Sequence, residues 1–402
     1  MSSSQPSILL YAEFLSNIRQ VSVGCDLPTP ISITTRAIVC ADGRALTVAH
    51  HGSSATIQLP VKVAPLLPLP ITKSVRTSLA WKIPLRVPSN GHNIPPSSEE
   101  SVPWSGIDLE PGSAVTCRTC KSVILNTGTL KVWKDLPSEN WAEMMEFWHC
   151  HKPDSHKDGN DEEDLANRGY GASSRIAAQP GVGFVDLTSF LLAESDLAKA
   201  SISASEVTNS NGNETKVTKT ALHCAICKTQ LGIRNDQALS VSIFKWQVLV
   251  KQRIGNIPES GPSLAQCVSA MLLAMARSGC SKSVLLPIKG LSRDESRSGH
   301  ASPARDVLHI WIYNANITFS STEAPTSPIN AVKVFYRMVS REEADKMLDS
   351  LTSGVEDISL PLEAITTVVG LLKKSNAFIP EGDREFKEWT VGFLEKWGGK
   401  GG

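Results

Sequence analysis

The sequence predicts an α+β fold with a β-rich N-terminal domain, a zinc-knuckle middle region and a C-terminal sheet with helices packed on one face. Three observations support this prediction. Short apolar runs separated by prolines fill residues 1–115, and two Cys-x-x-Cys pairs lie within residues 116–235. Strand and helix patterns then alternate over residues 236–402. We therefore expect three consecutive domains with these boundaries.

Residues 1–115 carry the signals of short antiparallel strands. Apolar and polar residues alternate over 31–37, and an Asp-Gly turn at 42–43 precedes another apolar run at 45–48. Further short runs follow at 55–63 and 78–87. The many prolines between these runs exclude long helices. A small antiparallel sandwich or open barrel is the expected architecture.

Residues 236–402 mix strand and helix patterns. A β run at 239–250 precedes residues 263–278, whose apolar positions recur at helical spacing. The later runs predict strands at 283–288, 307–317 and 331–338 and helices at 342–351 and 361–374. These elements predict one sheet with helices on a face.

The last aromatic residues form a separate pattern near the C-terminus. Phe386, Trp389, Phe393 and Trp397 are spaced by 3, 4 and 4 residues, which matches one face of a helix. We expect a terminal helix that either folds back onto its own sheet or grips another protein.

Composition excludes several classes of protein. The 402 residues include 40 Lys plus Arg and 40 Asp plus Glu, so the formal net charge is zero. This balance argues against a nucleic-acid partner bound through its phosphates. The hydrophobic content of 41% supports sizeable cores. We expect no contact with a membrane, because no window holds ~18 uninterrupted apolar residues.

The cysteine count indicates a reduced protein. The chain has nine cysteines, and an odd number in a long chain does not suggest a disulfide framework. The first apolar run has no basic segment before it, so we expect no signal peptide. The expected location is the cytoplasm, the nucleus or both.

Two Cys-x-x-Cys pairs give the strongest chemical signal. They are Cys117 with Cys120 and Cys224 with Cys227, and each pair is followed by a lysine. A two-residue gap lets both thiolates of a tight turn reach one ion, and two such turns supply the four sulfurs that structural Zn²⁺ prefers. Two alternatives stay open, namely four unrelated buried cysteines or redox use of a Cys-x-x-Cys pair.

A second group of chemically interesting residues lies at the end of an expected helix over 135–151. The apolar residues Trp141, Met144, Met145 and Trp148 share one helical face. Cys150 and His151 follow them. Cys150 could be an acyl-accepting nucleophile favoured by neighbouring imidazoles, Cys150 or His151 could join a zinc site, or Cys150 could be a buried structural residue.

Five segments in a fixed order resemble one protein family. They are CRTC at 117–120, LPSENWAEMMEFWHCHKP at 136–153, CAICKTQLG at 224–232, AVKVFYRMV at 331–339 and LLKKSNAFIP at 371–380. Together they resemble the HECT-like ubiquitin-conjugating-enzyme-binding proteins, which are described as ubiquitin ligases, over roughly residues 115–400. The resemblance implies a ubiquitin-conjugating enzyme, ubiquitin and a protein client as partners, with Cys150 at the position usually suspected as the ubiquitin acceptor.

One departure from HECT ligases leaves two functions open. A HECT ligase carries its catalytic cysteine near its C-terminus, whereas this chain has no cysteine after Cys280. The protein is then either a ubiquitin ligase or ligase-like adaptor in which Cys150 and His151 do the acyl-transfer chemistry, or a non-catalytic, zinc-stabilised binding protein that holds a client.

Overall fold

The computed structural model describes residues 7–64, 68–71, 75–85, 102–136, 177–204, 219–236, 238–251, 261–288, 306–325, 328–350 and 352–398. The chain divides into two compact units. Unit 1 comprises residues 1–101, 272–287 and 303–402, and unit 2 comprises residues 102–271 and 288–302. Unit 2 is therefore an insertion within the sequence of unit 1. The three consecutive domains expected from sequence differ in their bounds from these units and stay a prediction.

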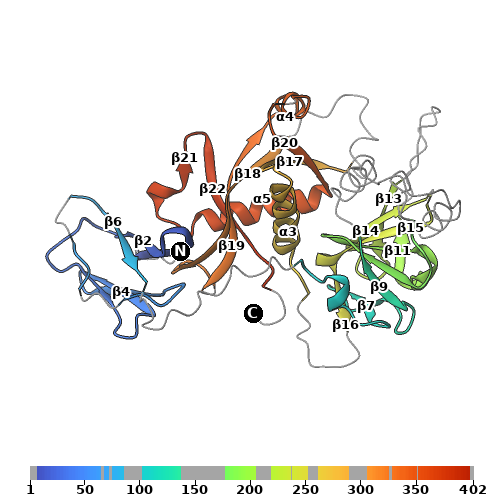
Figure 1. Cartoon of the computed structure of the whole chain (residues 1–402), viewed down its shortest axis with the longest axis horizontal. Coiled ribbons are helices and arrows are strands. Elements are labelled where there is room, and N and C mark those ends of the chain that lie inside the picture. Colours follow the sequence, from blue (N-terminus) through green and yellow to red (C-terminus); the bar gives the residue numbers. More distant parts are fainter. Residues whose placement is uncertain are drawn as a thin grey trace, which may run out of the picture. The chain divides into compact units, whose positions relative to one another are not determined.

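Unit 1 is built mainly from strands (Figure 1). Its strands are β1 (Leu9–Leu15), β2 (Gln20–Asp26), β3 (Arg36–Val39), β4 (Ala45–His50), β5 (Ser53–Gln58), β6 (Ser78–Pro84), β17 (Lys282–Pro287), β18 (Val307–Ser321), β19 (Ile329–Val339), β20 (Val355–Leu360), β21 (Glu385–Phe386) and β22 (Trp389–Glu395). Its helices are α4 (Arg341–Leu348) and α5 (Leu362–Asn376), and it also contains the end of α3 (Leu264–Arg277). The described residues are thus β-rich with three α-helices, which is consistent with the predicted α+β class.

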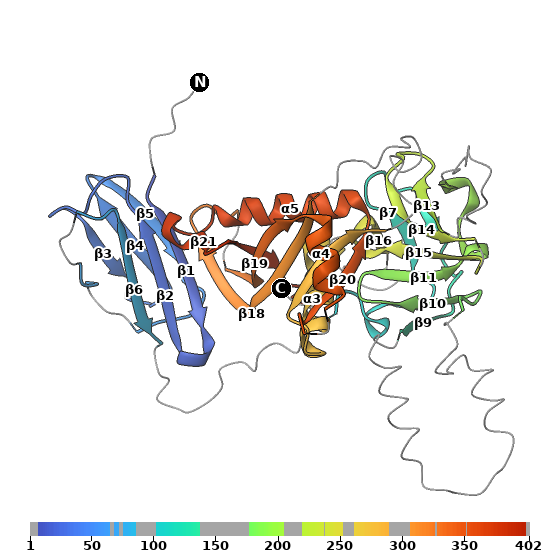
Figure 2. The ribbon, with the colours of Figure 1, turned by 90° about the horizontal axis from the view of Figure 1, so that it is seen from above.

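A nine-stranded sheet organises unit 1, in the order β21-β22-β19-β18-β1-β2-β6, with β17 and β20 continuing from β18. Strand β18 is long enough to pair with β19 on one side and with both β17 and β1 on the other. Helix α5 contacts β22 and β17, and Figure 2 shows it lying along the sheet. One face of this sheet therefore carries a helix, but the sheet combines the N-terminal strands β1, β2 and β6 with the strands that the sequence predicted within residues 236–402.

The N-terminal strands form two layers that pack against each other as in a β-sandwich. Strands β3, β4 and β5 make a separate antiparallel sheet, and buried apolar residues from this sheet and from β1, β2 and β6 form one core. The predicted turn at 42–43 joins β3 to β4. Strand β3 begins only at Arg36 because Ser32 and Thr35 form a local turn, in which the Ser32 amide donates to Thr35 Oγ1 at 2.9 Å.

The predicted terminal helix over Phe386–Trp397 is wrong. Strands β21 and β22 form a hairpin there, and β22 pairs antiparallel with β19. Trp389, Val391 and Phe393 are buried on one face of β22, because Trp389 and Phe393, four residues apart, share a face of a strand as well as of a helix. Lys387, with φ 54°, forms the turn that starts the strand. The segment is core rather than a docking helix.

Unit 2 contains two sheets. Strands β7 (Ala114–Cys117), β8 (Val123–Leu125) and β16 (Val248–Lys251) form a three-stranded sheet. The seven-stranded sheet contains β9 (Val132–Asp135), β10 (Val182–Val185), β11 (Ser189–Ala193), β12 (Ile202–Ala204), β13 (Lys219–Cys224), β14 (Gln230–Asn235) and β15 (Ser240–Phe244). A 3-10 turn at Lys245–Gln247 divides the predicted run at 239–250 into β15 and β16. Across the described parts of both units, the structure has no helix that is long and apolar enough to cross a membrane.

Candidate metal centre

Each cysteine pair of the sequence prediction lies in the turn of a β-hairpin in unit 2. Cys117 is the last residue of β7 and Cys224 is the last residue of β13. In the first turn the Lys121 amide donates to the Cys117 carbonyl oxygen at 2.9 Å, and in the second the Lys228 amide donates to the Cys224 carbonyl oxygen at 3.0 Å. These bonds close both turns in the same way, so the two pairs present their thiols from matching loops.

The four sulfur atoms converge on one point. All four ligand atoms lie within 4.8 Å of one another. The Sγ atoms of Cys117 and Cys227 are 3.6 Å apart, and those of Cys120 and Cys224 are 3.5 Å apart. Four sulfurs at about 2.3 Å from a tetrahedral Zn²⁺ ion would be about 3.8 Å apart. The residues therefore fit a single tetrahedral metal ion, and the predicted convergence of the four cysteines is confirmed.

Hydroxyl groups next to the sulfurs favour the thiolate form of two cysteines. Ser122 Oγ lies 3.2 Å from Cys120 Sγ and 3.2 Å from Cys224 Sγ, and Thr229 Oγ1 lies 3.2 Å from Cys227 Sγ. The Ser122 hydroxyl lowers the pKa of Cys120, and the Thr229 hydroxyl lowers the pKa of Cys227. Ser122 and Thr229 thus prepare the cluster for a cation, since metal ligands must be deprotonated.

Burial acts in the opposite direction at Cys117. This thiol is fully buried, and burial raises its pKa to about 12. A dication at the centre of the cluster would offset this penalty, because a coordinated thiol loses its proton. The convergence of all four sulfurs on one point therefore favours a closed structural metal site over redox use of a single Cys-x-x-Cys pair.

The other predicted site residues, Cys150 and His151, lie outside the described residues, as does the expected helix from residue 137 onward. Three buried cysteines beyond the cluster are not activated as nucleophiles by their surroundings. Burial raises the pKa of Cys25 to about 12, that of Cys267 to about 12, and that of Cys280 above its ordinary value. Cys267 lies on the buried face of α3. Cys40 is half-buried in the β3–β4 turn.

Lys245 is a buried residue of unit 2 that the sequence analysis missed. Its side chain is fully buried, and its Nζ atom donates to the Pro103 carbonyl oxygen at 2.6 Å. Burial lowers the pKa of Lys245 to about 8. Lys245 is the one charged residue in the run at 239–250, and this isolated charge was the signal that the sequence offered. It joins the segment before β7 to the turn between β15 and β16.

Three relatives are similar to most of this chain. An uncharacterized protein of Schizosaccharomyces pombe is 27% identical over 351 residues, which cover 85% of this chain and 92% of the relative. An uncharacterized protein of Saccharomyces cerevisiae is 24% identical, with 82% of this chain and 85% of the relative covered. A Pongo abelii protein named as an E3 ubiquitin-protein ligase is 24% identical, with 69% of this chain and 72% of the relative covered. No solved structure matches the chain.

The family match spans nearly all of the sequence. A family model described as HECT-like ubiquitin-conjugating enzyme (E2)-binding matches residues 13–391. This range includes the end of β1 and the start of β22 in unit 1 and all four clustered cysteines in unit 2. The match extends beyond the motif segments around the cysteines. The chain therefore belongs to the HECT-like family of ubiquitin-conjugating-enzyme-binding proteins.

Proposed function

We propose that this protein binds a ubiquitin-conjugating enzyme and promotes the transfer of ubiquitin to protein substrates, as a ligase or ligase-like adaptor. The observation that carries the proposal is the family match over residues 13–391. The Pongo abelii relative, named as an E3 ubiquitin-protein ligase, supports it. The partners are then a ubiquitin-conjugating enzyme, ubiquitin and a protein client, in the cytoplasm, the nucleus or both.

The proposed chemistry is acyl transfer through a thioester. A thiolate attacks the carbonyl carbon of the ubiquitin thioester, and the thiolate of the conjugating enzyme leaves. The amine of a substrate lysine then attacks the new thioester, forms an amide bond, gives up a proton and releases the acceptor thiolate. We assign the acceptor role to Cys150, with His151 beside it to favour the thiolate. Four described cysteines form the cluster and three others are buried, which leaves Cys40 and Cys150 as the two cysteines to be compared.

The cysteine cluster has a structural role in this proposal. Cys117, Cys120, Cys224 and Cys227 would hold one Zn²⁺ ion, which would tie β7–β8 to β13–β14. A four-sulfur shell leaves no open position for substrate. The ion would therefore stabilise unit 2, and the chain's own residues would do the binding and transfer.

A non-reducing gel after incubation with a charged conjugating enzyme tests the transfer step. We expect a ubiquitin adduct that reducing agent removes and that Cys150→Ala abolishes. Cys40→Ala is the matched control, because Cys40 is a half-buried cysteine outside the metal cluster, and this variant should retain the adduct. An adduct that survives Cys150→Ala would refute the assigned acceptor.

The second candidate function is a non-catalytic binding protein that holds a client. The absence of any cysteine after Cys280 favours it, because the chain lacks the C-terminal acceptor of HECT ligases. Co-purification separates the two functions. A protein that retains the conjugating enzyme but forms no adduct is an adaptor or a client-holding protein, and loss of the conjugating enzyme as well would refute the ligase proposal.

A further inference from the structure

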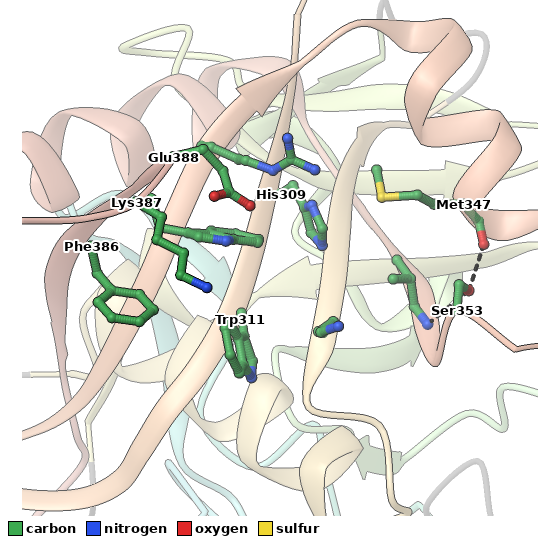
Figure 3. A pocket seen from close by; sticks show the side chains of 11 residues that line it. His309, Trp311, Met347, Ser353, Phe386, Lys387 and Glu388 are labelled. Atoms are coloured by element: carbon green, nitrogen blue, oxygen red, sulfur yellow. Dashed lines mark hydrogen bonds between the residues drawn. The ribbon is translucent and has the colours of Figure 1, made fainter.

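A pocket lies on the nine-stranded sheet of unit 1, far in sequence from the cysteine cluster. Its volume is about 460 Å³, which is within the range of small-ligand sites. The lining comes from strands β17 to β22, the β21–β22 turn, α4 and the segment after α4. Figure 3 shows Phe386 and Lys387 on one side of His309, and Met347 and Ser353 on the other.

His309 lines this pocket with two unsatisfied nitrogen atoms. Its side chain is 3% exposed, and neither Nδ1 nor Nε2 has a hydrogen-bond partner among the described residues. A neutral imidazole carries one N–H donor and one acceptor. Leaving either of them without a hydrogen bond in a buried site costs free energy. Because His309 lines the pocket, a ligand in the pocket can supply the missing partner.

Three cationic side chains line the same pocket, and each of them lies over an aromatic ring. Lys282 Nζ lies 5.4 Å from the Trp311 ring centre, and the guanidinium carbon of Arg337 lies 5.0 Å from that of Trp389. Lys387 Nζ lies 5.5 Å from the ring centre of Phe386. Ring contacts leave N–H groups available, unlike bidentate ion pairs with carboxylates. Within the described residues, Lys282 and Lys387 form no salt bridge, and Arg337 Nε is buried without a partner.

The arrangement of the strands explains why these groups meet. His309 of β18 is the register partner of Arg337 on β19, and Trp311 of β18 is the register partner of Lys282 on β17. Residues two apart on a strand share a face. The His309 ring also packs edge-on against Trp389, with ring centres 4.9 Å apart. Donors from three neighbouring strands are therefore fixed on one rigid surface.

The charges around the pocket indicate what it can hold. Lys282, Arg337 and Lys387 are positive, whereas Glu388 lines the pocket and Glu343 pairs with Arg337 at 2.8 Å. Three positive and two negative groups leave an excess of one positive charge. A single negative charge neutralises this excess, which fits a carboxylate better than a doubly charged phosphate. The aromatic lining, including Phe386 at 48% exposed, suits an apolar or aromatic group beside that charge.

We propose that this pocket binds a carboxylate carried on an apolar frame, such as the chain end of a peptide with an apolar last residue. The carboxylate accepts hydrogen bonds from Lys282, from the Nε–H of Arg337 and from the His309 ring, and the apolar part packs on Trp311 and Phe386. This site goes beyond the proposed ubiquitin function and does not depend on it, because it uses no cysteine and no metal.

The test uses three small probes with the full-length protein, with affinities measured by ligand-observed NMR titration. N-acetylphenylalanine carries the carboxylate, N-acetylphenylalaninamide carries the same frame without charge, and phenyl phosphate carries a different anion. We expect the carboxylate to bind at least about tenfold more tightly than the amide. Equal binding of the amide, or binding of phenyl phosphate without the carboxylate, would overturn the proposal.

Variants that remove a positive charge or a negative charge from the pocket test whether binding depends on charge. Lys282→Met and Lys387→Met should each weaken N-acetylphenylalanine binding at least about fivefold, whereas Glu388→Gln should strengthen it about threefold. Lys373→Met removes a lysine from the exposed surface of α5, outside the pocket lining, and should change nothing. Circular dichroism confirms folding of each variant. Weaker binding in Glu388→Gln, or an equal loss in Lys373→Met, would contradict the charge argument.

Discussion

Lys121 and Lys228 adopt the same left-handed backbone conformation, with φ 63° and 61°, at equivalent positions of the two cysteine turns. Each follows the second cysteine of its pair, and the amide of each donates to the carbonyl oxygen of the first cysteine. Left-handed backbone is costly for a residue with a Cβ. The two turns thus share one strained geometry, which aims both pairs of sulfurs at the same point.

Glycine at either of these positions should relieve the strain. We expect Lys121→Gly and Lys228→Gly each to raise the free energy of unfolding by about 0.5 kcal/mol, because the relief exceeds the extra entropy of the unfolded chain. Lys121→Val should lower it, since a β-branched residue tolerates φ above zero poorly. Lys134→Gly in the exposed part of β9 is the control and should be destabilising. Urea denaturation of the metal-loaded protein measures these effects, and destabilisation by both glycine variants would contradict the argument.

Loss of any clustered cysteine should unfold unit 2. We expect Cys117→Ser and Cys224→Ser to remove bound zinc and to lower stability by more than about 4 kcal/mol, because structural zinc contributes directly to folding. Elemental analysis should find one zinc ion per wild-type chain, and a chelator should lower the melting temperature of the wild type. Cys40→Ser is the control and should keep its zinc. Zinc-free wild-type protein with unchanged stability would end the metal proposal.

Gly232 of β14 should not tolerate a side chain. A Cβ atom there would lie 2.0 Å from the carbonyl oxygen of Ser242 on the neighbouring strand β15. We expect Gly232→Ala to cost about 3 kcal/mol, because backbone must move to accommodate it. Gly370→Ala on the exposed side of α5 meets nothing within 4 Å, and it should stabilise by about 0.5–1 kcal/mol through helix propensity. Chemical denaturation of both variants checks this contrast. Equal effects would show that the close approach in β14 does not decide the outcome.

His309 should make the protein less stable in mild acid. Burial, with help from Arg337 and Lys282, lowers the pKa of His309 from 6.5 to about 4 in the folded protein. As the pH falls from 6.5 to about 4, the unfolded chain takes up a proton that the folded protein does not. The stability contributed by the neutral ring is therefore fully present above pH 6.5, and it is lost as the pH falls from 6.5 to about 4. We expect the free energy of unfolding to fall by on the order of 2 kcal/mol over this window, after allowance for solvent screening.

Urea titrations at about pH 7 and about pH 5, on either side of the ordinary histidine pKa, measure this effect. His309→Gln should lose less stability between the two pH values than the wild type does, because glutamine does not titrate. Gly370→Ala on the exposed side of α5 adds and removes no titratable group, so it should keep the wild-type dependence of stability on pH. Identical pH dependence in His309→Gln and the wild type would show that this ring is not held neutral by the fold.

Local patterns in the sequence predicted much of the fold and the metal cluster. The Cys-x-x-Cys spacing predicts the turns at Cys117 and Cys224 because the ligands of each turn are close in sequence. Helices α3 and α5 follow from their apolar periodicity. The segment around Trp389 was misread because the spacing of Trp389 and Phe393 fits one face of a helix and one face of a strand, and pairing with β19 decided between them.

The features that the sequence analysis missed depend on contacts between residues that are far apart in the sequence. Lys282, His309 and Arg337 lie on three different strands, so no local pattern shows that they share one pocket. Only the sheet register aligns them. Lys245 is similar, since its hydrogen bond goes to Pro103, far away in the sequence. Periodicity within one segment carries no information about such partners.

The pairing of β1 with β18 has a consequence during synthesis. Strand β1 ends at Leu15, whereas β18 begins at Val307, with all of unit 2 encoded between them. On the ribosome, β1 can pair with β2 early, but the edge that later pairs with β18 must wait until unit 2 has been translated. An unpaired strand edge is a site of misassociation between nascent chains. Unit 1 can therefore complete its sheet only late in translation, and a cell that makes this protein quickly would need chaperones to cover β1 in the interval.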